Sequence, residues 1–223
     1  EWVFFSPFMV VVAISAIQFL ILERHYFSFS EFMRFAGGAL RFSWPIILNA
    51  IAMNFIGNYA KIYGYDHLSK NELLGISYVL RIGLIIQLTH SAFASYYSKS
   101  IFMDESQGIN LRIFRNYNLV LLAAAALVFC AVLITNWLFS STVYIAINGT
   151  NILFLVYIVI WCYIGYFEIY FGRRDANHRI LIYSLISAVV YLLSLRLVGT
   201  ITPLSLALSM VFSAILNLIL ELF

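Results

Sequence analysis

Seven apolar runs, each long enough to cross a lipid bilayer, dominate this sequence. A transmembrane helix needs about 20 mainly apolar residues, because each residue adds about 1.5 Å of rise. No water is available at the bilayer centre, so a segment there must satisfy its own backbone hydrogen bonds, and a helix does so. The sequence lacks the short alternating segments typical of membrane β-strands. We therefore expect an all-α integral membrane protein, a bundle of about seven transmembrane helices over residues 2–22, 44–64, 73–98, 117–139, 151–172, 180–195 and 203–221.

The composition agrees with this class. Hydrophobic residues make up 63% of the chain and charged residues 10%, whereas soluble domains have about 45–50% and about 25%. The net charge of +3 is spread along the chain and does not indicate nucleic-acid binding. Cys130 and Cys162 fall inside apolar runs without metal-ligand spacing, so both are interpreted as small core residues. The chain opens at Glu1 in an apolar run without an initiator Met, and we expect a fragment that lacks an N-terminal part.

Residues 23–43 separate the first two spans and are expected to form a cytoplasmic linker. Ser28 and Glu31 have the spacing of a helix capping box, and the aromatic residues that follow would form one apolar face. This pattern predicts a short amphipathic helix at the membrane interface, with a bend at Gly37-Gly38 into the second span. An aromatic-rich loop is the alternative. Pro45 is expected in the first turn of the second span, where a missing N–H costs nothing.

The basic residues are distributed unevenly between the two sides of the membrane. Of the 13 Lys and Arg residues, the loops of one side hold Arg24, Arg34, Arg41, Lys99, Arg112, Arg115, Arg173, Arg174 and Arg179. The opposite loops hold Lys70 and Arg196. The positive-inside rule assigns the basic side to the cytoplasm. We therefore expect a multi-pass protein of the bacterial inner membrane whose C-terminus is cytoplasmic.

Polar residues inside the second span fall on one side of the expected helix. Asn54, Asn58, Lys61 and Tyr65 lie within about 60° of one another at 100° per residue. One interpretation is a polar stripe that lines a wet cavity. The other is interhelical hydrogen bonding by the asparagines, with Lys61 reaching the outer interface.

The third span carries a wider polar arc of about 120°, formed by Ser77, Arg81, Gln87, Ser91, Ser95 and Ser98. His90 points to the other side and is expected to be a packed core residue. Arg81 lies roughly 12 Å from the outer end of the span, too deep to reach the interface easily. No acidic residue of the chain has a matching depth, so Arg81 needs an acid from elsewhere, a hydrated cavity or an anionic ligand. A guanidinium binds phosphate bidentately, whereas a purely structural ion pair is the alternative role.

Catalytic machinery is not evident in the sequence. The segments outside the spans are too short for a soluble catalytic or nucleotide-binding domain, and no phosphate-binding loop motif occurs. No nucleophile–base pair, carboxylate dyad or metal site stands out. We expect a transporter without a cofactor rather than an enzyme.

Residues 43–100 resemble the C-terminal half of the Wzx-type O-antigen flippases, members of the polysaccharide exporter family in the MOP superfamily. The resemblance rests on Ser43-Trp44-Pro45 at the start of a span, the polar segment 54–61, a short outer loop, and Glu72-Leu73-Leu74-Gly75-Ile76-Ser77-Tyr78 followed by Arg81. It implies that residues 44–223 form the C-terminal six-helix lobe, and residues 1–22 the last helix of an N-terminal lobe. The family fold places two such lobes around a central cationic cavity.

The resemblance implies a flippase that moves undecaprenyl-diphosphate-linked O-antigen or other polysaccharide repeat units across the inner membrane, as lipopolysaccharide biosynthesis requires. Arg81, assisted by Lys61, would attract the diphosphate, while Asn54, Asn58 and Gln87 would bond sugar hydroxyls and Ser91 would line the same cavity. The implied partners are the lipid-linked glycan, membrane lipids, a coupling proton or other cation, a polysaccharide polymerase and a chain-length regulator, but no nucleic acid.

Other functions remain open at this point. A multidrug or small-molecule antiporter of related architecture would share the same spans. A glycan polymerase or ligase typically needs a larger outer loop than this chain has. A purely structural membrane subunit would leave Arg81 unexplained.

Overall fold

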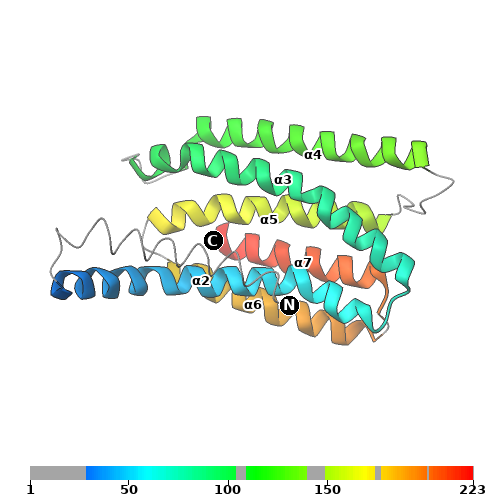
Figure 1. The fold of residues 1–223 in the computed structure, drawn as a ribbon, viewed down its shortest axis with the longest axis horizontal. Coiled ribbons are helices and arrows are strands. Elements are labelled where there is room, and N and C mark those ends of the chain that lie inside the picture. Colours follow the sequence, from blue (N-terminus) through cyan, green and yellow to red (C-terminus); the bar gives the residue numbers. More distant parts are fainter. Residues whose placement is uncertain (1–28, 104–108, 140–148, 174–176, 200, 223) are drawn as a thin grey trace. The chain divides into compact units, whose positions relative to one another are not determined.

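The computed structural model of the chain describes residues 29–103, 109–139, 149–173, 177–199 and 201–222. Within these ranges the chain is helical and contains no strand. The helices, drawn in Figure 1, are α2 (Phe29–Tyr65), α3 (Lys70–Met103), α4 (Leu111–Phe139), α5 (Gly149–Arg173), α6 (Asn177–Val198) and α7 (Pro203–Leu222).

Six of the helices in the described ranges are long and apolar enough to cross a membrane. Their membrane segments are Ala36–Tyr65, Lys70–Met103, Leu111–Thr135, Thr150–Gly172, Asn177–Val198 and Pro203–Leu222. The expectation of a multi-pass membrane helical bundle is therefore confirmed for these six spans. The expected span over residues 2–22 lies outside the described residues.

Helix α2 begins earlier than the sequence pattern predicts. It continues without interruption through Gly37 and Gly38, so the segment expected as a separate amphipathic helix is the start of α2. The prediction that Pro45 occupies a first turn is wrong, because Pro45 lies inside α2. Proline there cannot donate to the carbonyl of Arg41, four residues earlier. The chain forms two compact units, one that ends at Trp44 and one that begins at Pro45.

The helix ends follow local sequence signals. Ser69 precedes α3, and its backbone N–H and hydroxyl both donate to the Glu72 carboxylate, at 2.8 and 2.7 Å. This is the capping box of a helix start. Asn110 precedes α4, and its side-chain oxygen accepts hydrogen bonds from the backbone N–H groups of Arg112 and Ile113, at 3.1 and 3.2 Å. Gly199 follows α6 with φ of 69°, the left-handed conformation that glycine adopts readily after a helix.

Helix α5 is the centre of the packing within the unit from Pro45 onward. It contacts α3 on one side and α7 on the other, while α4 packs on α3 and α6 packs on α7 (Figure 1). The fully buried side chains of Phe154, Cys162 and Ile164 come from α5, and those of Leu206 and Met210 from α7. Large apolar side chains elsewhere are exposed, as expected where helices face lipid.

The two cysteines differ in environment. Cys162 is buried in α5, as the sequence predicts. Cys130 is exposed on α4, so its interpretation as a core residue is wrong. Its helix packs mainly against α3 and leaves its other faces open. An apolar residue in a transmembrane helix can equally well face lipid, which hydropathy alone does not reveal.

Candidate functional site

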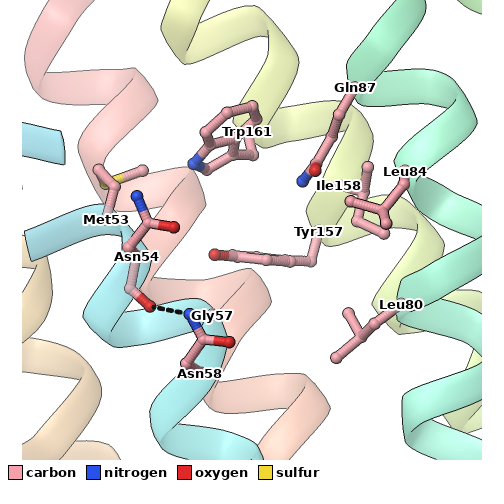
Figure 2. A pocket seen from close by; sticks show the side chains of 10 residues that line it. All are labelled: Met53, Asn54, Gly57, Asn58, Leu80, Leu84, Gln87, Tyr157, Ile158 and Trp161. Atoms are coloured by element: carbon pink, nitrogen blue, oxygen red, sulfur yellow. Dashed lines mark hydrogen bonds between the residues drawn. The ribbon is translucent and has the colours of Figure 1, made fainter. Parts of the chain in front are cut away.

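A cavity of about 230 Å³ lies between α2, α3 and α5. Figure 2 shows the side chains that surround it: Met53, Asn54, Gly57, Asn58, Leu80, Leu84, Gln87, Tyr157, Ile158 and Trp161. The lining contains three side-chain amides and two aromatic rings that carry a hydrogen-bonding group. None of these lining residues is charged. The cavity can therefore take a neutral polar group that makes several hydrogen bonds.

Helix α2 supplies Asn54 and Asn58, one helical turn apart on the same face. The side-chain nitrogen of Asn54 donates to the carbonyl of Ala50 at 2.8 Å, and that of Asn58 donates to the carbonyl of Asn54 at 3.0 Å. These bonds to the preceding turn fix both amides, and their side-chain oxygens point toward the cavity in Figure 2. The two oxygens are acceptors already oriented for a donor inside the cavity.

The opposite walls come from α3 and α5. Gln87 projects its amide from α3 toward Tyr157, and the Tyr157 hydroxyl points toward Asn54 (Figure 2). Trp161 lies one turn after Tyr157 on α5, and its ring nitrogen is directed at the cavity (Figure 2). Amide, hydroxyl and indole groups together offer both donors and acceptors, while the rings offer flat apolar faces.

The predicted site residues are only partly brought together. Asn54, Asn58 and Gln87 line the cavity, as a polar face was expected to do. Arg81 and Ser91 are exposed on α3 and do not belong to the lining. Arg81 and Gln87 lie six positions apart on α3, which separates them by about 120° around the helix axis, so they are at opposite edges of the polar arc and only Gln87 reaches the cavity. Lys61 belongs to α2, but its side chain lies outside the described residues.

Arg81 has no ion-pair partner in the part of the chain that the structure describes. The roles of Arg81, Lys61 and Ser91 in substrate binding stay predictions.

His90 occupies a buried polar site that is separate from the cavity lining. Its ring nitrogen Nδ1 lies 2.9 Å from the hydroxyl of Tyr117 on α4, and that hydroxyl donates to the carbonyl of Cys162 on α5 at 2.7 Å. The ring of Tyr117 stacks on that of Tyr166 with centroids 4.3 Å apart. The prediction that His90 is a packed core histidine is confirmed.

Sequence reasoning missed a second polar cluster, where α2, α5, α6 and α7 meet. The side-chain nitrogen of Asn49 donates to Glu168 at 2.7 Å, and the hydroxyl of Ser184 donates to the side-chain oxygen of Asn49. Asn217 and Glu221 of α7 are buried as well. The one available signal was the one-turn spacing of Asn217 and Glu221 in an otherwise apolar span.

Comparison of the chain with protein-family models, with curated proteins and with solved structures finds no match.

Proposed function

We propose that this chain is part of a flippase that moves lipid-linked oligosaccharide, of the undecaprenyl-diphosphate-linked type used for O-antigen and other polysaccharides, across the bacterial inner membrane. The observation that carries the proposal is the uncharged cavity rich in amide and aromatic groups within a bundle of membrane-spanning helices. Sugars present many hydroxyls and weakly apolar ring faces, and such a lining matches both.

The transport step needs a polar path for the head group only. The lipid tail stays in the bilayer, while Asn54, Asn58 and Gln87 exchange hydrogen bonds with sugar hydroxyls in place of water. Each buried sugar hydroxyl requires such a partner, because an unpaired hydroxyl in an apolar medium costs several kcal/mol, on the order of 2–7. Tyr157 and Trp161 would pack against the sugar rings. Rocking of helical lobes about this site would expose it to each side in turn.

The diphosphate requires positive charge, which the cavity lining lacks. In this proposal Arg81 and Lys61 supply it from α3 and α2. An exposed guanidinium without an acidic partner in the described chain is available to a phosphate, which it can hold with two parallel hydrogen bonds. The basic residues of the loops support an orientation with the C-terminus in the cytoplasm.

Glycan export in cells that carry substituted proteins tests the proposal. Asn58→Leu and Gln87→Leu keep similar side-chain volume but remove hydrogen bonds, and each should lower export about tenfold or more, since one or two hydrogen bonds correspond to about 1.4 kcal/mol. Arg81→Ala should abolish export and Arg81→Lys should restore part of it. The matched control is Asn71→Leu, an exposed asparagine in the first turn of α3 that lies outside the cavity lining.

Membrane levels of every variant must equal the wild-type level for this comparison. Normal export by both cavity variants would contradict the sugar site, and normal export by Arg81→Ala would contradict the phosphate site. If cells that carry the cavity variants lose drug resistance while glycan export stays normal, the protein is instead a small-molecule antiporter. The absence of a carboxylate from the lining residues in Figure 2 disfavours organic cations as cargo.

A further inference from the structure

Helix α4 packs mainly against α3 and leaves its opposite side open. At 100° per residue, a set of exposed side chains on that side falls within about 100° around the helix axis. This lipid-facing stripe consists of Arg112, Arg115, Leu119, Leu122, Phe129, Leu133 and Trp137. The stripe is therefore apolar along most of its length and basic only where α4 begins.

The apolar part of the lipid-facing stripe has the length of a bilayer. The rise from Arg115 to Trp137 is about 33 Å along the helix axis, and the hydrocarbon core of a bilayer is about 30 Å thick. Tryptophan is common at the membrane interface, and the Trp137 side chain is 78% exposed. With Trp137 at one interface, Arg112 and Arg115 lie at the level of the lipid head groups on the other side.

The two arginines occupy an electrostatically unfavourable place in α4. The start of a helix carries partial positive charge, which repels cations, and the first turn of α4 contains no acidic residue. Arg112 and Arg115 also lie about one turn apart, a spacing at which like charges repel. Neither has an ion-pair partner in the part of the chain that the structure describes. An anion bound to both guanidinium groups would relieve these repulsions.

We propose that Arg112 and Arg115 bind the head group of an anionic phospholipid whose acyl chains lie along the stripe. Guanidinium groups hold phosphate oxygens through paired hydrogen bonds. The exposed side chains of Leu119 and Leu122 follow within the next two turns, so the acyl chains meet apolar surface directly below the phosphate.

The pair of arginines also gives this site a preference among lipids. A zwitterionic phospholipid has a phosphate as well, but it brings an ammonium group that two neighbouring arginines repel. A lipid with net negative charge avoids that repulsion. The site lies on α4, which contributes no residue to the cavity lining, so this inference does not depend on which substrate the protein transports.

Native mass spectrometry of the detergent-purified protein tests the lipid site. The protein is mixed with equal amounts of phosphatidylglycerol and phosphatidylcholine that carry the same acyl chains, and the retained lipids are counted. We expect the wild type to retain phosphatidylglycerol preferentially. Arg112→Gln combined with Arg115→Gln should lower this preference about thirtyfold, which corresponds to about 1 kcal/mol for each arginine. Arg112→Lys combined with Arg115→Lys should keep most of it, because both positive charges remain.

The matched control combines Lys70→Gln with Arg196→Gln, which also removes two positive charges from exposed positions, on α3 and α6. It should leave the preference unchanged. Thermal unfolding without added lipid shows whether the variants are folded, and the double glutamine variant on α4 should be at least as stable as the wild type because the repulsion is gone.

Three results would overturn the proposal. The wild type could retain both lipids equally. The control could lose the preference as fully as the arginine variant, which would show that only net charge matters. An excess of soluble glycerol phosphate could displace phosphatidylglycerol, which would show that the arginines recognise a free anion without the lipid chains.

Discussion

At the scale of single residues, Tyr117 connects three helices through hydrogen bonds in the core. Its hydroxyl joins Cys162 and His90, and its side chain is 1% exposed. Tyr117→Phe would leave a buried carbonyl and a ring nitrogen without their partner, so we expect a loss of about 1 kcal/mol in the free energy of unfolding. Denaturant unfolding in detergent measures this loss. Tyr96→Phe, at 78% exposure on α3, should cost nothing, and equal effects of the two substitutions would contradict this role.

Residue-level prediction from the sequence succeeds where residues share one helix. Asn54 and Asn58 fall one turn apart, so helical geometry alone places them on a common face. The same geometry separates His90 from the polar arc of α3. It cannot say which face meets which neighbouring helix, and so the hydrogen bond from Asn49 to Glu168 was not predicted. The wide polar arc of α3 also grouped Arg81 with Gln87, although only Gln87 reaches the cavity.

Gly83 governs the contact between α3 and α5 at the scale of helices. It is buried, and a Cβ atom at this position would collide with the side chain of Ile158. The closest atom is the terminal methyl carbon of Ile158, a buried side chain that must change its rotamer to make room, so Gly83→Ala should destabilise the protein by about 1 kcal/mol despite the better helix propensity of alanine. Gly75→Ala lies on the same helix, and its Cβ would meet no atom within 4 Å. Gly83→Ala should unfold at a lower temperature than Gly75→Ala. The reverse order would show that the Ile158 side chain moves aside at little cost.

The helices were predictable because a chain inside lipid has few alternatives to a helix. Their ends were less so. The capping residues Ser69 and Asn110 lie several residues before the apolar runs that marked α3 and α4, because a helix continues into the interface where hydropathy no longer identifies it. Pro45 is the clearest example, since proline is common at a helix start but also tolerated inside membrane helices.

At the scale of the whole molecule, the order of packing could not be predicted from the sequence. Every span from α2 to α7 is apolar, so composition does not reveal that α5 contacts both α3 and α7. The small and polar residues of α7, which include Ser205, Ser209 and Ser213, are buried in these contacts. Small side chains let helices approach closely in lipid, where apolar surface alone gives no preference. The distribution of basic residues along the sequence does predict an orientation of the whole chain in the membrane.

The orientation can be measured by introducing one cysteine at a time into a Cys130→Ser background, in which the remaining Cys162 is buried, and labelling with a membrane-impermeant maleimide. His67 lies in the turn between α2 and α3, and Arg179 lies near the start of α6; both are exposed. Three spans, α3 to α5, separate the two positions, so they must lie on opposite sides of the membrane. Because Lys99, Arg112 and Arg115 flank the same side as Arg179, we expect His67→Cys to be labelled in spheroplasts and Arg179→Cys only in inverted vesicles. The reverse pattern would turn the bundle over and place the C-terminus on the opposite side of the membrane. Labelling of both positions from one side would contradict the three intervening spans.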